Sequence, residues 1–295
     1  MLTRSLIPSL LVTTGLSVAM LWLPDTSVAQ EYTMKTKIVS INPKIVEESW
    51  MHHGIVVGVR KVEDHANAGP EDPPQTVTDA VGEFPDGEYW EFHPSGQWVQ
   101  YFKPYKNGLK DGLYKEMEDG QIIKLSVKYK EGRKNGPLTI YHPGSNEAKM
   151  IIPYVENIQE GEVKLFLANG KLEMIENFKR GAAQPFQKTR YEYDPEGNTR
   201  MEHFFDFDTA TGHRKYFRED GTVDWEVGLN GDQLVDYKRY TGSGKILEDH
   251  PGPFNGDIPT YYASGELMQN DHYLNGYPAG FTMYDLRGRV LMKSR

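Results

Sequence analysis

Histidine could supply metal or proton chemistry, and two of the chain's 9 histidines, His52 and His53, are adjacent. A metal site needs three or four ligands at a spacing that the backbone can bring together. No third histidine lies at helical or strand spacing from this pair. Two others, His93 and His142, stand at the same position of a repeating pattern, just before a turn proline. We therefore predict structural roles for all four.

A second candidate for metal chemistry is the acidic run from Asp206 to Gly212, which superficially resembles a calcium loop. An EF-hand loop has glycine at its sixth position and a bidentate glutamate at its twelfth. Here the glycine falls one position late, and no glutamate closes the loop. We expect no metal site.

Catalytic motifs are absent from the sequence. There is no G-x-S-x-G, no H-E-x-x-H, no P-loop, and no G-x-G-x-x-G after a strand. Carboxylate pairs could serve a glycosidase, but with 42 acidic residues any such pairing lacks specificity. The chain has no cysteine, which excludes thiol catalysis, cysteine-based zinc sites and disulfides. We expect a non-catalytic protein without a cofactor.

The charge balance limits the possible partners. The formal net charge is −9, and no long run of Lys or Arg is present. Nucleic acids and anionic lipid surfaces both attract clusters of basic residues. We therefore expect neither as a partner of the mature chain.

Aromatic residues, at 12% of the chain, are the strongest candidates for binding. They recur at related positions, and those that we single out are Tyr89, Trp98, Tyr114, Tyr216, Trp225, Tyr237 and Tyr261. Two interpretations are open. These side chains form the core of a thin sheet, which we favour, or one aromatic face stays open and binds a peptide or glycan by stacking.

Glycines reveal the elements that must position these aromatics. Intact units begin 24 or 25 residues apart, with leading glycines at Gly87, Gly112, Gly136, Gly161, Gly212, Gly256 and Gly280. A second glycine recurs at Gly96, Gly120, Gly144, Gly170, Gly197, Gly221, Gly244, Gly265 and Gly288. Self-similarity at a fixed period indicates a repeat protein. The pattern predicts about nine units over residues 85–295.

Each unit is expected to form one β-hairpin. The second glycine supplies the positive φ of a tight turn. The strand that follows alternates, as in Ile123, Leu125, Val127 and Tyr129, which is typical of a half-buried strand. A lone hairpin cannot bury its face, so the units must stack side by side. We predict an all-β fold: tandem hairpins of about 24 residues in an elongated, curved, single-layer antiparallel sheet.

The unit [DN]-G-x-x-x-x-[YF]-x-x-x-G-x-[LIV], closed by [YF]-x-x-G, resembles the MORN repeat in its bacterial variant form. The resemblance covers residues 85–295, with a divergent unit at 182–208. It implies a curved array of β-hairpins that acts as a scaffold or interaction element. Many bacterial relatives carry an antitoxin-like label, which implies the alternative of an immunity protein.

The N-terminus predicts export. Arg4 precedes an apolar run from Leu6 to Leu23, and Ser27-Val28-Ala29 fits a signal peptidase site. We predict a signal peptide over residues 1–29, cleaved after Ala29, and a periplasmic, outer-surface or secreted mature protein. An uncleaved membrane anchor is the alternative.

Residues 30–84 do not fit the repeat and are expected to form a small α+β cap with a Pro-rich linker. The patterns predict strands over 36–41 and 55–62 and a short helix over 43–53, begun by Asn42 and Pro43. Residues 66–78 are polar and proline-rich, which favours a loop.

Three functions follow from these patterns. We favour an exported, non-catalytic scaffold that binds a protein or cell-envelope polymer through an aromatic sheet face. An immunity protein that neutralises a toxin is the alternative. An enzyme acting on envelope glycans is the remote alternative, and it would need a pocket with two convergent carboxylates.

Overall fold

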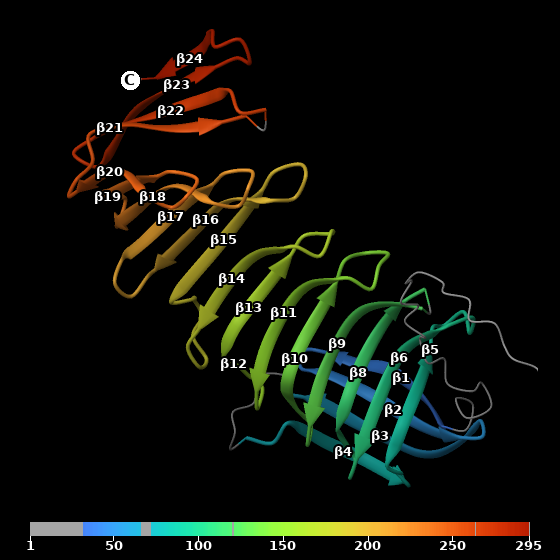
Figure 1. Ribbon diagram of the computed structural model, residues 1–295. Coiled ribbons are helices and arrows are strands. Elements are labelled where there is room, and N and C mark those ends of the chain that lie inside the picture. The colour runs from blue at the N-terminus through green and yellow to red at the C-terminus, as the bar shows by residue number, and fades with distance from the viewer. Residues whose placement is uncertain (1–31, 66–71, 120, 263, 295) are drawn as a thin grey trace, which may run out of the picture.

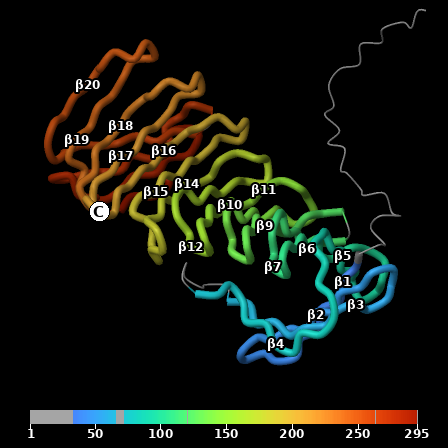
Figure 2. The backbone as a smooth tube through the Cα atoms, turned by 90° about the horizontal axis from the view of Figure 1, so that it is seen from below, coloured from blue at the N-terminus to red at the C-terminus, as the bar shows by residue number. Residues whose placement is uncertain are grey.

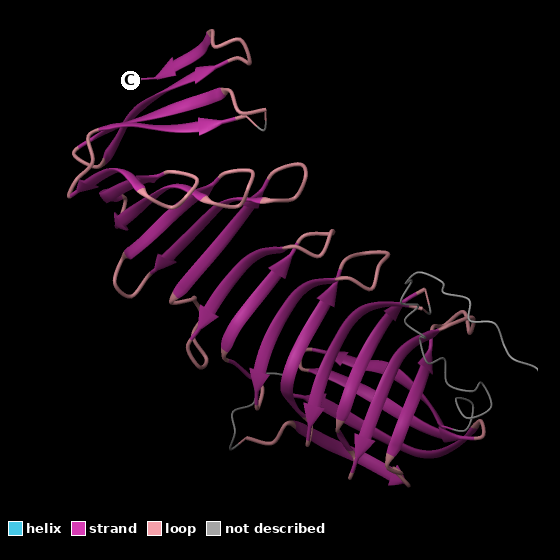
Figure 3. Cartoon of the chain, viewed as in Figure 1, coloured by secondary structure: helices cyan, strands magenta, loops and turns pink. Residues whose placement is uncertain are grey.

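The protein is all-β in the computed structural model, which describes residues 32–65, 72–119, 121–262 and 264–294. This part of the chain contains 24 strands and no helix (Figures 1 and 3). It accordingly holds no apolar helix long enough to span a membrane. The predicted signal peptide and the turn glycine Gly120 lie outside the described residues.

Nine consecutive hairpins make up the array, which confirms the predicted repeated-hairpin fold. Their strands are β5 (Gly87–Phe92) and β6 (Val99–Lys106), β8 (Gly112–Glu118) and β9 (Ile122–Lys130), β10 (Arg133–Tyr141) and β11 (Ala148–Val155), β13 (Gly161–Phe166) and β14 (Leu172–Phe178), β15 (Gln187–Tyr193) and β16 (Thr199–Asp206), β17 (Thr211–Phe217) and β18 (Val223–Asn230), β19 (Gln233–Tyr240) and β20 (Ile246–Pro251), β21 (Gly256–Tyr261) and β22 (Leu267–Leu274), and β23 (Tyr277–Tyr284) and β24 (Val290–Ser294). Two short strands, β7 (Leu109–Lys110) and β12 (Ile158–Gln159), join neighbouring hairpins.

The N-terminal segment is a four-stranded antiparallel meander rather than an α+β cap. Its strands are β1 (Tyr32–Ile41), β2 (Lys44–His52), β3 (Ile55–Asp64) and β4 (Gln75–Gly82). The predicted helix over 43–53 is wrong, because those residues contain the whole of β2, which pairs with β1 on one side and β3 on the other. Asn42 and Pro43 lie in the turn before β2 and do not cap a helix.

The predicted Pro-rich loop is also shorter than expected. Its last residues, 75–78, belong to β4, which pairs with β3 at the edge of the sheet. Thr76, Val77 and Thr78 are good strand formers once a neighbouring strand offers hydrogen bonds. The predicted strands over 36–41 and 55–62 lie within β1 and β3.

A repeated turn geometry explains the second glycine of each unit. In the β17–β18 hairpin, the Gly221 N–H donates to the Arg218 carbonyl at 3.0 Å, and the Arg218 N–H donates to the Thr222 carbonyl at 2.8 Å. Gly221 has φ +80°, as a type I turn with a glycine bulge requires. The same pair of bonds recurs at Gly170, Gly197, Gly244, Gly265 and Gly288.

In three units the Asp or Asn before the leading glycine caps the closing turn of its own hairpin. Asp86 Oδ1 accepts from the Asn107 N–H at 2.5 Å, and Asn255 Oδ1 accepts from the Asn275 N–H at 2.7 Å. Asn107 and Asn275 have φ values of 50° and 51°, and each is followed by a glycine with positive φ, as in a type I′ turn. The [DN]-G pair of the motif is therefore explained by turn capping.

Leading glycines also let neighbouring strands approach closely. A Cβ at Gly212 would lie 2.3 Å from the backbone oxygen of Phe204, and one at Gly112 would lie 3.0 Å from Pro104. Only a hydrogen fits at Gly212 without moving the backbone of β16.

The array is not a single layer throughout, because both ends are folded back. At the start, β1 lies beside β5 in parallel, and β1–β4 pack against the first hairpin (Figures 1 and 2). At the other end the long sheet stops at β20, and β21–β24 form a separate four-stranded sheet. The side chains of β21 and β22 pack against β17–β19. Between these ends the sheet remains a single layer.

We expect Gly212→Ala to lower the free energy of unfolding by about 2–3 kcal/mol, because the new methyl group must displace the β16 backbone. Gly242→Ala is the matched control, since Gly242 has ordinary φ and its nearest neighbouring atom is 4.0 Å away. The control should change stability by no more than about 0.5 kcal/mol. Urea unfolding followed by circular dichroism measures both. Equal midpoints for the two variants would contradict the close approach.

Candidate functional site

One row of directly paired side chains crosses the whole long part of the array. Paired residues of antiparallel strands point to the same face of a sheet. From β5 to β20 the row reads Glu91, Tyr101, Glu116, Leu125, Ile140, Met150, Leu165, Met174, Arg190, His203, Arg214, Val227, Tyr237 and His250. We call the face that carries this row the inner face.

Both folded ends of the protein lie over the inner face. Tyr89, two residues before Glu91 on β5, packs on Trp50 of β2 with ring centroids 4.5 Å apart. Tyr237, a member of the row, packs on Phe254 with centroids 4.6 Å apart. The inner face is therefore closed at its two ends.

The centre of the inner face is apolar and uncovered. Five consecutive members of the row, from Leu125 to Met174, are aliphatic or methionine side chains. They are half-buried, and over β11–β14 no second layer of described strands lies on the sheet (Figures 1 and 2). A parallel row of Tyr114, Val127, Leu138 and Ile152 runs beside the stripe, and within it Val127 is buried, at 2% exposed.

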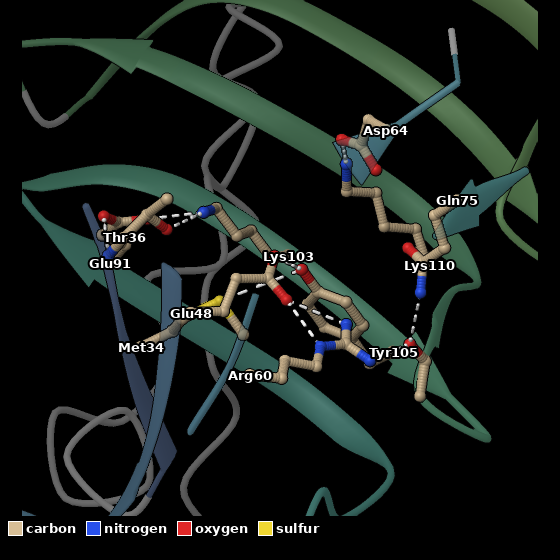
Figure 4. A network of polar contacts seen from close by, with 11 residues as sticks. Met34, Thr36, Glu48, Arg60, Asp64, Gln75, Glu91, Lys103, Tyr105 and Lys110 are labelled. Atoms are coloured by element: carbon tan, nitrogen blue, oxygen red, sulfur yellow. Dashed lines mark hydrogen bonds and ion pairs between the residues drawn. The ribbon is translucent and has the colours of Figure 1, made fainter. Parts of the chain in front are cut away.

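A buried charge network holds the N-terminal end (Figure 4). Arg60 Nε donates to Glu48 Oε2 at 2.9 Å, and the Tyr105 hydroxyl donates to Glu48 Oε1 at 2.8 Å. Arg60 and Glu48 are each 4% exposed. The guanidinium lies 5.1 Å from the centre of the Trp50 ring and donates to the Gly108 carbonyl at 2.7 Å. One arginine therefore joins β3 to β2, to the aromatic core and to the first closing turn.

A second buried pair joins β1 to the first hairpin. Lys103 Nζ lies 2.5 Å from Glu91 Oε2, and it also donates to Thr36 Oγ1 at 2.8 Å. The Thr36 N–H donates to Glu91 Oε1 at 2.8 Å. Between β1 and β5 the parallel ladder consists of a single residue pair, Thr33 with Trp90. Side-chain bonds therefore supply much of this junction.

These carboxylates stabilise the fold and are poorly placed for acid–base chemistry. Each is paired with a buried cation, Glu48 with Arg60 and Glu91 with Lys103. Burial, together with the charge of Glu48, raises the pKa of the Tyr105 hydroxyl well above its usual value, so Tyr105 remains a donor. Cavities of about 440, 520 and 550 Å³ lie elsewhere, and neither Glu48 nor Glu91 lines any of them.

The predicted aromatic face is largely core. Tyr89, Tyr216, Trp225 and Tyr237 are between 0% and 8% exposed, so they are not available to a ligand on an open face. Tyr216 and Trp225 stack on each other within the C-terminal core, with centroids 5.4 Å apart. At these four positions the burial agrees with the core interpretation that we favoured, and it contradicts the alternative of an open aromatic face.

The other three predicted aromatics are half-buried and lie apart. Tyr114 is on the apolar stripe, and Trp98 stacks on His93 in an outer turn at 4.7 Å. Tyr261 borders the cavity of about 550 Å³ at the break between the sheets. Arg218 closes that region by donating to Asp224 and to the Tyr240 carbonyl.

The histidine and acidic candidates take part in turns. His93 Nδ1 lies 3.0 Å from Ser95 Oγ, and His142 Nε2 lies 3.0 Å from the Phe166 carbonyl oxygen. Asp206 Oδ1 accepts from the Asp208 and Thr209 N–H groups. Within the described residues, no group of three or more potential ligands could hold a metal ion.

Most of the apolar row was missed by sequence reasoning, although the repeat spacing contains it. Leu125, Met150 and Met174 are 25 and 24 residues apart, as are other repeat positions. The repeat was hard to see at this position because its residue type changes between leucine, isoleucine and methionine from unit to unit. The aromatic residues, which are easier to see in the sequence, mark the core instead.

Comparisons with known proteins give limited information. No protein-family model matches the chain, and no curated protein matches it. Among solved structures the chain is similar to the TcdB2-TccC3-Cdc42 complex and to the Photorhabdus luminescens Tc holotoxin pore, each at 11% identity and a TM-score of 0.20. These likenesses cover 83% and 84% of this chain and 15% of each of those chains. Such low TM-scores support no conclusion about function.

We expect Glu48→Gln to lower the free energy of unfolding by about 3 kcal/mol, because it leaves the Arg60 charge buried without a counter-ion. The matched control is Glu162→Gln, whose partner Lys164 lies 3.1 Å away in a pair that is 54% and 40% exposed. An exposed pair contributes about 0–1 kcal/mol. Urea unfolding followed by tryptophan fluorescence compares the two. A similar small change in both variants would show that the buried network contributes little.

Trp225→Ala should lower the free energy of unfolding by about 3–5 kcal/mol, since it empties a core position that is 4% exposed. Trp98→Ala, at a half-buried turn position, should cost about 1 kcal/mol or less. Thermal unfolding of the two variants distinguishes core from surface aromatics. If Trp225→Ala left the stability unchanged, Trp225 would not be a core residue and would again be a candidate for ligand binding.

Proposed function

We propose that this protein is an exported, non-catalytic, MORN-type scaffold whose inner face binds an extended protein segment or cell-envelope polymer. The single observation that supports this most is the apolar row from Leu125 to Met174, half-exposed and uncovered. Contiguous apolar surface on a soluble protein commonly marks an interaction site. The signal-peptide pattern of residues 1–29 supports export.

The dimensions of the row favour a polymer over a small metabolite. Neighbouring strands lie about 4.8 Å apart, so five successive strands span roughly 20 Å. An extended chain laid across the strands could contact one side chain of the row per strand. A closed pocket of the kind that small ligands prefer would instead surround its ligand on several sides.

Photo-crosslinking in intact cells tests this proposal with an internal control. Met150 and Ile151 are adjacent on β11, but only Met150 belongs to the inner face. Leu165 and Lys164 form the corresponding couple on β13. We expect benzoylphenylalanine at position 150 or 165 to capture a partner, and the same residue at 151 or 164 to capture much less.

Mass spectrometry of the crosslinked product then identifies the partner class. An envelope protein or a glycan attached at 150 and 165 supports the scaffold. A toxin captured there would favour the immunity alternative, in which the same face neutralises that toxin. Equal capture from both faces, or capture from neither, would overturn binding by the inner face.

A further inference from the structure

Beyond the apolar centre, the inner face becomes cationic. Arg190 on β15 pairs directly with His203 on β16, and His203 pairs directly with Arg214 on β17. Arg190 and Arg214 occupy the repeat position that Ile140 and Leu165 hold in the two units before them. In chain order these four residues are separated by 25, 25 and 24 residues. Two neighbouring units thus carry arginine where the preceding units carry aliphatic side chains.

One long ion pair offsets the charge of this row among the described residues. Arg190 and Arg214 lie on either side of His203 and are not directly opposite each other. Arg190 lies 3.9 Å from Glu192 of its own strand, while His203 and Arg214 form no ion pair with a carboxylate among the described residues. In a chain of net charge −9, this local excess of positive charge needs an explanation. A bound anion would offset this charge.

A cavity lies beside the row. Its volume is about 520 Å³, and both His203 and Arg214 line it. The second sheet contributes Tyr273 and Tyr277 to its wall, and β16 and β18 contribute Phe205 and Leu229. Small-ligand sites are usually mostly apolar with a few polar groups that fix orientation. This cavity has that composition and a suitable size.

One polar atom of the residues that line the cavity lacks a partner. Among the described residues, His203 Nε2 is buried and makes no hydrogen bond. Buried polar atoms without partners are uncommon and costly, and they often mark the place of a ligand. Burial raises the pKa of the Tyr273 hydroxyl, and the neighbouring Arg214 opposes that rise. Two residues of the lining therefore offer a guanidinium and an imidazole nitrogen without a partner.

We propose that this cavity binds one anionic group, a carboxylate or a phosphate, carried on a ring or another compact apolar body. Arg214 supplies the charge, His203 Nε2 donates a hydrogen bond, and the walls of Tyr273, Tyr277 and Phe205 contact the body of the ligand. The site goes beyond the proposed scaffold function and does not depend on it, because a small anion is sufficient to occupy it.

The charge state of His203 links this site to pH. Burial first, and then Arg214, His213 and Arg190, lower the pKa of His203 below its usual value, so the unliganded ring is neutral near pH 7. Tyr273 on β22, Tyr277 on β23 and Asp232 at the β18–β19 turn are the other ionisable groups that line the cavity. A bound anion stabilises the imidazolium form and raises that pKa. Affinity should therefore increase as pH falls from 8 to 6.

Nuclear magnetic resonance of the whole chain tests the site, with the His203 ring signal assigned by comparison with His203→Gln. Benzoate and phenylphosphate are the probes, and benzyl alcohol is the neutral control. We expect a saturable shift of the His203 signal and an increase of its pKa with an anionic probe. The stronger of the two probes identifies the anion class as carboxylate or phosphate. Benzoate stays ionised between pH 6 and 8. A titration with benzoate at several pH values in this range therefore measures how its affinity depends on the protonation of His203.

Arg214→Gln should weaken binding of the anionic probe by about tenfold or more, because a hydrogen bond to a charged group is lost. Arg287→Gln, at an exposed outer turn, is the matched control and should bind normally. Circular dichroism checks that both variants fold. Competition between the two anionic probes for the unaltered protein tests, without any variant, whether they share one site.

Three results would overturn the proposal: no saturable shift with either anion, equal binding of benzyl alcohol, or full affinity in a folded Arg214→Gln variant. Failure here leaves crosslinking from Met150 and Leu165 unaffected, because those residues lie outside the cavity. Loss of the crosslinks, conversely, would leave anion binding in place. The two proposals can therefore fail separately.

Discussion

Backbone hydrogen bonding between successive hairpins is the interaction on which the rest of this structure depends. A two-stranded hairpin is at best marginally stable alone, so each unit needs a neighbour on both edges. Residues near the closing turns bond directly across units, as where the Gly132 N–H donates to the Lys110 carbonyl at 2.8 Å and the Gly231 N–H to the Ala210 carbonyl at 2.6 Å. The array therefore grows sideways. Growth of this kind extends the sheet without covering its faces.

The two ends solve the burial problem in different ways. The N-terminal meander covers the inner face with a core in which Trp50 and Tyr89 are fully buried, and buried ion pairs surround that core. The C-terminal sheet covers the other end with stacked aromatics and few charges. Between them the face stays open over β10–β14. A solenoid of this kind keeps its ends closed and leaves its middle for interaction.

Local patterns predicted the hairpins well, because turn glycines and alternating strands determine a hairpin within a few residues. They failed where distant contacts decide the outcome. Residues 43–53 contain helix-start signals, yet β1 and β3 lie on either side and satisfy the backbone as a strand. Nor could spacing show that β21–β24 separate from the long sheet, which is why Trp225 and Tyr237 looked available to a ligand. The cationic positions Arg190 and Arg214 could be found only by comparing equivalent positions of successive units.

The orientation of the strands has a mechanical consequence. They run across the long direction of the array (Figure 1), so tension along that direction pulls each strand away from its neighbour rather than sliding it past. The backbone hydrogen bonds between two strands that are pulled apart in this way break one after another and not all at once. One detached unit of about 24 residues can extend to roughly 80 Å at about 3.4 Å per residue. The chain is therefore built to lengthen in steps under load, as an elastic spacer does, while the remaining units keep their shape.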